Sequence, residues 1–152
     1  MEPTHKYQIR AISGAPRSGV VIAGGIEPQI SFSAPPEFKG QAGCWTPEHF
    51  LVAAVASCYV STFSGMALNS NFEFVSLELE TVGTLVQDEK GWRFAEILLV
   101  PRLAGVRPEQ KGLGTRLLIK AKENCLVGRS LACPLVLESA VIIEEQKELV
   151  HQ

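Results

Sequence analysis

The chain has 152 residues, of which 46% are hydrophobic and 20% are charged, and its formal net charge is −2. These values are those of a globular protein, and they exclude a disordered or collagen-like chain. The small negative charge and the lack of a Lys/Arg cluster argue against a nucleic-acid partner. We expect a single domain over residues 1–152, long enough to bury a core without disulfides or metal.

The N-terminal sequence is polar and has no apolar region of the kind found in signal peptides. The longest uninterrupted apolar run, residues 50–56, is much shorter than the roughly 20 residues that cross a bilayer. We therefore predict a cytoplasmic protein without a membrane partner.

The N-terminal third of the chain predicts three short strands. Residues 6–12 alternate apolar and polar side chains as a strand does, and residues 13–19 have the Gly, Pro and Ser content of a turn. Residues 20–23 then form the returning strand of a hairpin, and residues 30–33 form a third strand. The Pro- and Gly-rich residues 34–43 are predicted to be a loop without helix.

A long helix is predicted to begin at Thr46 and to end near Leu68. Thr46 can cap the free N–H groups, Pro47 suits the first helical position, and Glu48 complements the helix dipole. The helix is apolar on nearly every face, which predicts a central helix covered on all sides.

The remaining sequence predicts a long hairpin, a second helix and a final strand. Residues 72–87 alternate as a strand with one wet face, and residues 92–103 form its returning partner. A second helix is expected from residue 107, with Cys125 on its apolar face and a break at Gly128. A last strand is expected over residues 134–144. Strands grouped on both sides of helices predict the α+β class.

Four cysteines occur in this chain, which has no secretory signal, so we expect them to be reduced at rest. Their spacing fits neither a C-x-x-C motif nor a zinc site, which predicts that the protein binds no metal. Cys58 and Cys125 both fall on predicted core-facing helix surfaces. If these helices pack together, one thiol can attack an O–O bond and the other can close a disulfide. Spacing alone favours the alternative, in which both are small core residues.

Two further residues bear on Cys58. Arg17 lies in a predicted turn, and a guanidinium near a thiol lowers the pKa of that thiol. Glu48 lies ten residues before Cys58, or about 15 Å along a helix axis, so the two meet only if helices of two chains run antiparallel. This geometry predicts a homodimer. His49 is about 13.5 Å from Cys58 along the same axis, which argues against a Cys–His hydrolase.

The sequence of residues 45–58, WTPEHFLVAAVASC, resembles the (N/T)-P-E-x-L-(L/F)-A-A-x-x-(A/S)-x-C helix of the OsmC/Ohr family. Residues 33–40 resemble the loop before that helix, and residues 124–131 resemble the region of the second cysteine. The resemblance implies an OsmC-like α+β fold in which antiparallel sheets wrap around two long central helices of an intertwined homodimer.

The resemblance also implies a thiol peroxidase that needs no cofactor. Organic hydroperoxides, with hydrogen peroxide as a further substrate, would be reduced to alcohols, and an external thiol or dithiol would restore the enzyme. By this resemblance Cys58 is the attacking thiolate and Cys125 the resolving thiol. Arg17 and Glu48 would form an ion pair over Cys58, supplied by the neighbouring chain.

Apolar side chains around the thiol are expected to favour greasy hydroperoxides, with Phe50, Tyr59 and Phe63 as the predicted substrate-binding residues. The sequence departs from the organic-hydroperoxide branch at Leu126, where that branch has proline, and at residues 15–16 of the arginine turn. The subfamily is therefore open, and Cys133 is a rival resolving thiol. The alternative function is a catalytically silent or redox-sensing dimer in which Cys58 is structural.

Overall fold

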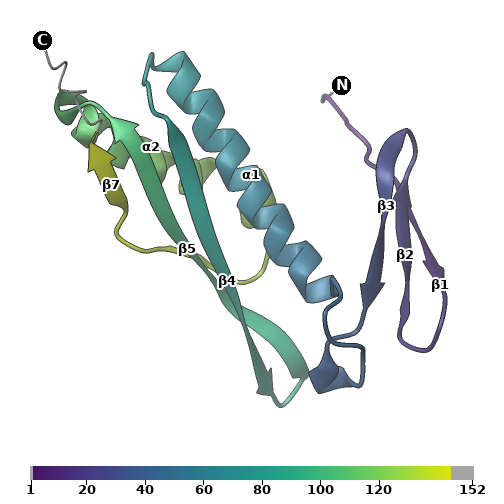
Figure 1. Cartoon of the computed structure of the whole chain (residues 1–152). Coiled ribbons are helices and arrows are strands. Elements are labelled where there is room, and N and C mark those ends of the chain that lie inside the picture. Colours follow the sequence, from purple (N-terminus) through teal and green to yellow (C-terminus); the bar gives the residue numbers. More distant parts are fainter. Residues whose placement is uncertain (1, 145–152) are drawn as a thin grey trace, which may run out of the picture. The chain divides into compact units, whose positions relative to one another are not determined.

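The structure, a computed structural model, describes residues 2–144. They group into two compact units, Met1–Leu51 and Val52–Gln152. The boundary falls inside the long helix α1 (Pro47–Asn69), shown in Figure 1. The single domain over 1–152 therefore stays a prediction, and the units are described separately.

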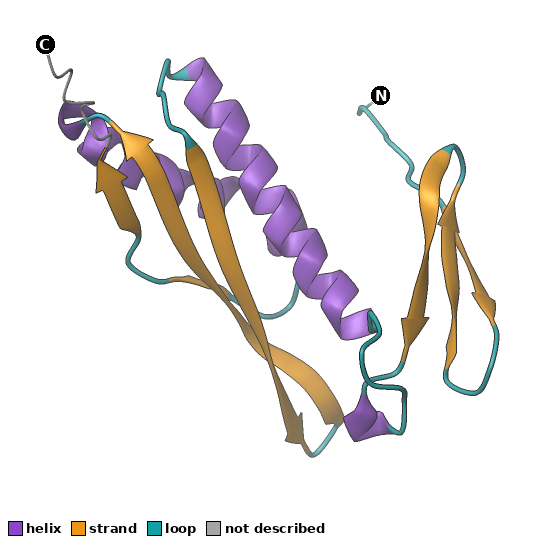
Figure 2. Cartoon of the chain, viewed as in Figure 1, coloured by secondary structure: helices purple, strands orange, loops and turns teal. Residues whose placement is uncertain are grey.

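The first unit contains a three-stranded antiparallel sheet in the order β1-β2-β3. Its strands are coloured orange in Figure 2 and have these bounds: β1 Ile9–Ser13, β2 Ser18–Ala23 and β3 Ile26–Ser33. The predicted hairpin is confirmed, but β3 begins four residues before the expected position. The strand includes Pro28, which cannot donate a ladder hydrogen bond.

The loop after β3 contains a short 3₁₀ helix, η1 (Pro36–Phe38), so the expectation of no helix in this loop was wrong. Ser33 anchors the loop: its buried hydroxyl donates to the Ala34 carbonyl (3.0 Å) and accepts from the Gln41 N–H (2.8 Å). Gly40 lies so close to the Ala34 carbonyl oxygen that a Cβ there would be 1.5 Å from it. The loop is therefore tightly packed where it leads into α1.

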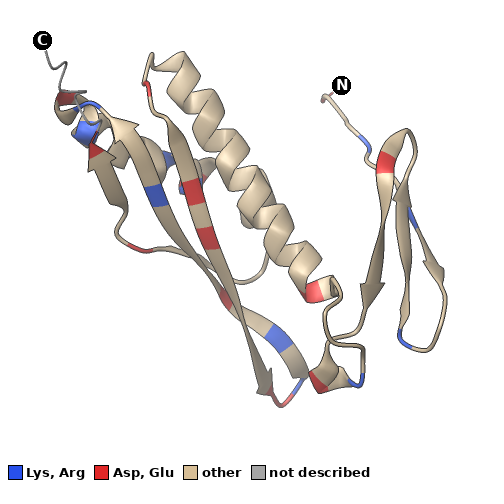
Figure 3. Cartoon of the chain, viewed as in Figure 1, with Lys and Arg blue, Asp and Glu red and all other residues tan. Residues whose placement is uncertain are grey.

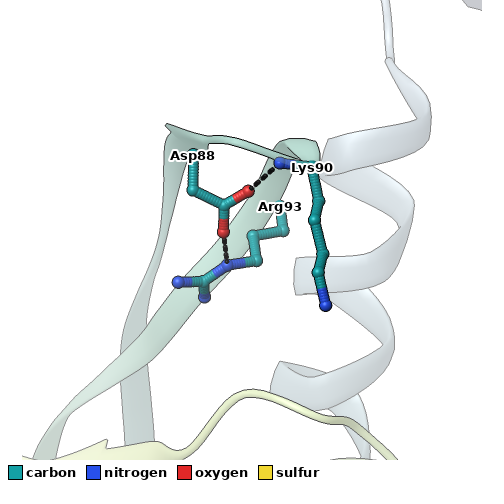
Figure 4. Close-up of polar contacts among 3 residues, drawn as sticks. All are labelled: Asp88, Lys90 and Arg93. Atoms are coloured by element: carbon teal, nitrogen blue, oxygen red, sulfur yellow. Dashed lines mark hydrogen bonds and ion pairs between the residues drawn. The ribbon is translucent and has the colours of Figure 1, made fainter.

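The second unit is built on the long hairpin of β4 (Ser76–Asp88) and β5 (Gly91–Val106). In its turn, Asp88 accepts hydrogen bonds from the Lys90 N–H (2.8 Å) and from Arg93 Nε (2.6 Å), as Figure 4 shows. The hydrogen bond from Arg93 is the main cause of the lowered pKa of Asp88. The predicted hairpin and its turn are confirmed, although β4 begins at Ser76 rather than at residue 72.

One face of the hairpin is buried and the other is wet, as the alternating sequence predicted. The buried face of β5 carries Ile97, Leu99, Pro101 and Leu103, each almost inaccessible to solvent. On β4 the exposed alternate positions include Glu78 and Glu80, and Figure 3 shows red positions along this strand. Two short strands, β6 (Leu135–Leu137) and β7 (Val141–Glu144), extend the sheet at the other edge of β5.

The last two strands differ from the expectation in two ways. The single strand over 134–144 is divided into β6 and β7, and both run parallel to β5 rather than antiparallel. The direction follows from the connection: the chain leaves β5, runs through η2 (Pro108–Gln110), α2 (Lys111–Asn124) and α3 (Leu126–Arg129), and returns as a crossover. The α+β fold is as predicted, with one mixed sheet.

In the second unit α1 packs lengthwise beside β4 and β5 (Figure 1). Gly83 of β4 makes this approach possible, since a Cβ there would lie 2.7 Å from Val52 of α1 and from Phe94 of β5. The buried residues of α1 recur every fourth position, at Val55, Tyr59, Phe63 and Ala67. Among residues 2–144 only this face of α1 is fully buried, so the described part of one chain does not cover the helix on all sides as expected.

Helix α1 is long and apolar enough to cross a membrane by length and composition, with a mean hydropathy of 1.7 over its most apolar window. It carries one acidic residue in its first turn and is otherwise uncharged in Figure 3. The longest uninterrupted apolar run underestimates the apolar length of this helix, because scattered Ser and Thr residues interrupt the run but lower the mean hydropathy only slightly. The same properties are found in core helices of soluble proteins.

Candidate active site

Cys58 lies in the middle of α1, on a half-buried position next to the buried Tyr59. Its side chain is therefore accessible from one side while it rests on the core of the second unit. Thr62 lies one turn further along the helix, where its hydroxyl donates to the Cys58 carbonyl at 2.8 Å. The sequence predicted a fully buried thiol, and the structure places it at the edge of the core instead.

Cys125 lies between α2 and α3 and is inaccessible to solvent. Cys125 is buried like Leu117 and Ala121 of the apolar face of α2, as expected, but its backbone is extended (φ −66°, ψ 101°), so it follows the helix instead of lying within it. The N–H of Cys125 bonds the Lys122 carbonyl at 3.4 Å, which closes the last turn of α2. Its sulfur lies 3.8 Å from the carbonyl oxygen of Val55, one turn before Cys58 in α1.

The two sulfurs are brought together by this arrangement. Each of the two thiols influences the pKa of the other. In the contact with Val55, the Cys125 thiol is the donor and the Val55 carbonyl is the acceptor.

The pKa of the Cys58 thiol is lowered from its ordinary value. Partial burial is the largest single influence and raises this pKa, but four hydrogen bonds together outweigh it. They come from the Val127 N–H, the Cys125 thiol, the Thr62 hydroxyl and the Leu126 N–H. The Thr62 hydroxyl has one proton and also donates to the Cys58 carbonyl, so the backbone N–H groups are the constant donors.

The pKa of the Cys125 thiol is shifted in the opposite direction. Burial raises it most, and the hydrogen bond to Cys58 and the Cys58 charge raise it further. The N–H groups of Gly128 and Val127 lower it only in part. Of the two thiols, Cys58 is therefore the more readily ionised, and Cys125 is the one that holds its proton more strongly.

Gly128 fixes the position of the chain behind the two sulfurs. A Cβ on Gly128 would lie 2.3 Å from Leu135 Cδ1 and 3.4 Å from the Cys125 sulfur. Only glycine allows α3 to pack this closely against β6. The expected break at Gly128 is therefore wrong: the residue lies inside α3, and its role is close packing.

Arg17 and Glu48 both belong to the first unit. Arg17 lies in the turn before β2 with a left-handed backbone (φ 62°), and its carbonyl accepts the Ala34 N–H at 2.8 Å. It lines an open cavity of about 530 Å³ together with Ile12 and Phe32. Glu48 has a buried carboxylate oxygen, Oε2, without a hydrogen-bond partner within the described chain. No ion pair joins Arg17 to Glu48 among residues 2–144. Their pairing over Cys58 remains a prediction.

Two of the three predicted substrate-binding residues belong to the core. Tyr59 and Phe63 are 0% exposed, the Tyr59 hydroxyl donates to the Leu118 carbonyl at 2.8 Å, and Phe63 packs edge-on against Phe72. Burial and the nearby Cys125 raise the pKa of Tyr59, which keeps its hydroxyl neutral. The helix is apolar all round, so the sequence did not reveal which face is buried. Phe50, in the first unit, is half-buried and stacks on Trp45.

In the part of the chain that the structure describes, the other candidate residues form neither a metal site nor a second catalytic site. Over residues 2–144 no group of three or more His, Cys, Asp or Glu residues could hold a metal ion. His49 Nδ1 lies 2.8 Å from the Thr46 hydroxyl, which in turn accepts the His49 N–H at 3.1 Å. This imidazole is therefore engaged in capping α1. Cys133 is half-buried before β6 and is not among the groups that act on Cys58.

Sequence reasoning missed the backbone donors at Cys58. The N–H groups of Leu126 and Val127 have no side-chain signature, and only the structure shows that the chain turns back after Cys125. Thr62 had a signal that was overlooked, since it lies four residues after Cys58 and hence on the same helical face.

Comparison with known proteins settles the family. Residues 40–140 match the family model described as "OsmC-like protein", which is well over half of the chain. The chain belongs to the OsmC-like family. The resemblance found in the sequence is thereby confirmed, and the matched region contains Glu48, Cys58 and Cys125.

Relatives of this OsmC-like chain are distant in sequence. It is 26% identical to the uncharacterized protein YmaD of Bacillus subtilis over 104 residues, covering 66% of this chain and 69% of YmaD. An OsmC-like protein of unknown function from Vibrio cholerae superposes with a TM-score of 0.78 at 21% identity, covering 91% of this chain and 100% of that one. An organic hydroperoxide resistance protein from Elizabethkingia anophelis gives a TM-score of 0.73 at 17% identity, covering 96% and 100%. These structural likenesses confirm the OsmC-like fold.

Proposed function

We propose that this protein is a cytoplasmic thiol peroxidase that reduces organic hydroperoxides to alcohols, with Cys58 as the attacking thiolate. The observation that carries the proposal is the placement of the buried Cys125 sulfur against α1, 3.8 Å from the Val55 carbonyl and one turn from Cys58. The pKa values of the two thiols are shifted in opposite directions, which supports it. A pair of this kind supplies one nucleophile and one protonated partner. Its family includes proteins named for organic hydroperoxide resistance, which supports the same class of substrate.

In the first step the Cys58 thiolate attacks the outer oxygen of the hydroperoxide. An S–O bond forms while the O–O bond breaks, so Cys58 becomes a sulfenic acid and the other oxygen leaves as an alkoxide. The alkoxide takes the proton of the adjacent Cys125 thiol and departs as the alcohol. The products are one sulfenic acid, one alcohol and the Cys125 thiolate.

In the second step the Cys125 thiolate attacks the Cys58 sulfenic sulfur. A disulfide forms and hydroxide leaves, which takes a proton from solvent to become water. Once Cys58 is a neutral sulfenic acid, its charge no longer raises the pKa of Cys125. The N–H groups of Gly128 and Val127 then favour the Cys125 thiolate. An external dithiol finally reduces the disulfide.

Oxidation with a limiting amount of peroxide tests this proposal. Reduced protein treated with one equivalent of cumene hydroperoxide is expected to show the Cys58–Cys125 disulfide in non-reducing peptide mass spectrometry, with one equivalent of cumyl alcohol released. Cys44 and Cys133 serve as internal controls and should remain thiols. A disulfide that uses Cys133, or no disulfide at all, would contradict the assignment and favour the sensing or structural alternative.

We further propose that the working form is a homodimer. Helix α1 has an exposed face opposite its buried one, and this face carries small or apolar residues: Ala54, Ser57, Ser61, Gly65 and Leu68. Leu68 is 79% exposed. A second copy of α1 would cover this face, and small residues let two helices approach closely. The unpartnered carboxylate oxygen of Glu48 also requires a donor.

Substitution of Gly65 tests the dimer. Within one chain a Cβ at Gly65 meets nothing within 4 Å, so Gly65→Leu should be harmless to a monomer. If two α1 helices pack at Gly65, the variant is expected to lose the dimer and sediment as a single 16.5 kDa chain. Lys120→Leu, at an exposed position of α2, is the matched control and should keep the wild-type mass. A monomeric wild type, or a dimeric Gly65→Leu protein, would refute this interface.

A further inference from the structure

Helix α1 places the hydroxyl of Thr62 beside Cys58. The two residues are four apart, so their side chains lie on the same helical face, with Cβ atoms about 5–6 Å apart. Side chains of a helix lean toward its N-terminus, and Thr62 therefore covers the turn that carries Cys58. The hydrogen bond from the Thr62 hydroxyl to the Cys58 carbonyl, at 2.8 Å, fixes the hydroxyl oxygen in this place.

Within one chain both side chains are partly accessible. Cys58 and Thr62 are half-buried, whereas the residue that follows each of them is 0% exposed. Along the helix, Thr62 lies on one side of Cys58 and Cys125 on the other, since the Cys125 sulfur contacts the carbonyl of Val55, three residues before Cys58. Cys58 thus lies between a buried thiol and a partly accessible hydroxyl.

The Thr62 hydroxyl uses its single proton in the hydrogen bond to the backbone. Its oxygen keeps lone pairs that can accept a further hydrogen bond. Burial is the largest influence on the pKa of Cys58 and raises it, but the Thr62 hydroxyl lowers this pKa, as a group within reach of the sulfur does. A hydroperoxide has one hydrogen-bond donor, the O–H of its outer oxygen, and this oxygen is the atom that Cys58 attacks in the proposed cycle. An acceptor next to the sulfur is therefore suited to orient the reacting atom.

Resting on the proposed peroxidase function, we propose that Thr62 is a substrate-binding residue, whose hydroxyl oxygen accepts a hydrogen bond from the O–H of the hydroperoxide and holds the outer oxygen against the Cys58 sulfur. The hydrogen stays on this oxygen when the S–O bond forms and the O–O bond breaks, so it becomes the hydrogen of the sulfenic acid. The alcohol takes its hydrogen from Cys125, as in the first step of the cycle. Thr62 therefore keeps the same contact from the substrate to the sulfenic acid.

Thr62→Val tests this role, because valine has the branched shape of threonine without the hydroxyl. The backbone hydrogen bonds of α1 are kept, and Thr62→Ala is a second variant with a better helix former. Thr62→Ser keeps a hydroxyl that can bond the same carbonyl. The matched control is Thr115→Val in α2, since the Thr115 hydroxyl also donates to the carbonyl four residues before it, at 3.1 Å.

The readout is the ratio of two rates at Cys58, measured on the full reduced chain over a range of pH and located by peptide mass spectrometry. One is oxidation by cumene hydroperoxide, and the other is alkylation by N-ethylmaleimide, which has no N–H or O–H to donate. Both reagents react with the thiolate, so the ratio cancels any change in the thiolate fraction. Losing one hydrogen bond to the substrate is expected to lower this ratio about three- to tenfold in Thr62→Val and Thr62→Ala. Thr62→Ser and Thr115→Val should keep the wild-type ratio.

An unchanged ratio in Thr62→Val, with hydroperoxide still oxidising Cys58, would overturn this proposal and leave the peroxidase function intact. Oxidation and alkylation that fall together would give this result, because the hydroxyl would then act on the thiolate rather than on the substrate. A loss in Thr62→Ser as large as that in Thr62→Val would also overturn it. If wild-type Cys58 reacts with cumene hydroperoxide no faster than free cysteine does, both the peroxidase function and this proposal fail.

Discussion

Replacing Cys58 with serine is expected to reduce the turnover of cumene hydroperoxide by at least roughly a thousandfold. A serine hydroxyl in this position stays protonated, because the hydrogen bonds that favour a thiolate are too weak to ionise an alcohol. Cys125 does not replace Cys58 as the nucleophile, because burial raises the pKa of Cys125 and disfavours its thiolate. The measurement is steady-state consumption of cumene hydroperoxide with a dithiol as reductant.

The controls for this variant are the two cysteines outside the pair. Cys44→Ser and Cys133→Ser are expected to keep the wild-type turnover, because neither sulfur is among the groups that act on Cys58. Turnover that survives in Cys58→Ser would eliminate Cys58 as the nucleophile. Turnover lost in Cys133→Ser alone would instead identify Cys133 as the resolving thiol.

The second large effect is expected for Cys125→Ala, which removes the proposed resolving thiol and one of the groups that lower the pKa of Cys58. Its loss should raise the pKa of Cys58 and reduce the thiolate fraction at neutral pH. Below its pKa, a thiol loses about tenfold in thiolate fraction for each pH unit. The rate of the first oxidation at neutral pH should therefore fall about tenfold for each unit by which the pKa rises. Without a resolving thiol, excess peroxide should carry Cys58 on to sulfinic acid.

Cys125→Ser separates the two roles of Cys125. Its hydroxyl still donates a hydrogen bond to Cys58 but cannot form a disulfide. We expect a Cys58 alkylation midpoint near the wild-type value in Cys125→Ser and a raised midpoint in Cys125→Ala, with over-oxidation in both. Stopped-flow oxidation at several pH values and intact-protein mass spectrometry provide these two readouts. Identical midpoints in the two variants would show that Cys125 does not stabilise the thiolate.

The parts of the fold with strong local signals were predictable from the sequence. Helix α1 begins where Thr46 was expected to cap it, and the Thr46 hydroxyl indeed accepts the His49 N–H. The long hairpin followed from alternation over many residues and from its turn, where Asp88 accepts two hydrogen bonds. These features depend on contacts between residues that are close in sequence, and such contacts can be predicted from a single sequence.

The errors concern features that depend on long-range packing. The four-residue spacing of Leu117 and Ala121 continues to Cys125, so the sequence predicted helix there, whereas α2 ends at Asn124. The turn at Cys125 is stabilised by contacts with α1 and by the fit of Gly128 against Leu135. These contacts join different elements of the chain, so the periodicity of the sequence does not predict them.

The sequence predicted which side chains form the candidate site. It did not predict the backbone N–H groups that lower the pKa of Cys58. The pairing of Cys58 with Cys125 followed from two apolar helical faces, and Cys125 is buried as expected, although it follows the last residue of α2. The activating charge was assigned to Arg17, a side chain of the first unit. The structure shows that hydrogen bonds from the backbone already lower the pKa of Cys58 within the second unit. Whether Arg17 adds to them is a separate prediction.

The Val127 N–H lowers the pKa of both thiols, and this sharing bears on the lifetime of the oxidised intermediate in the proposed cycle. Once Cys58 is oxidised and uncharged, this N–H is expected to act on Cys125 alone, at the step in which Cys125 must attack. The proposed cycle therefore predicts a short-lived sulfenic acid, which would suit rapid recycling rather than the slow, persistent oxidation that a signalling protein needs.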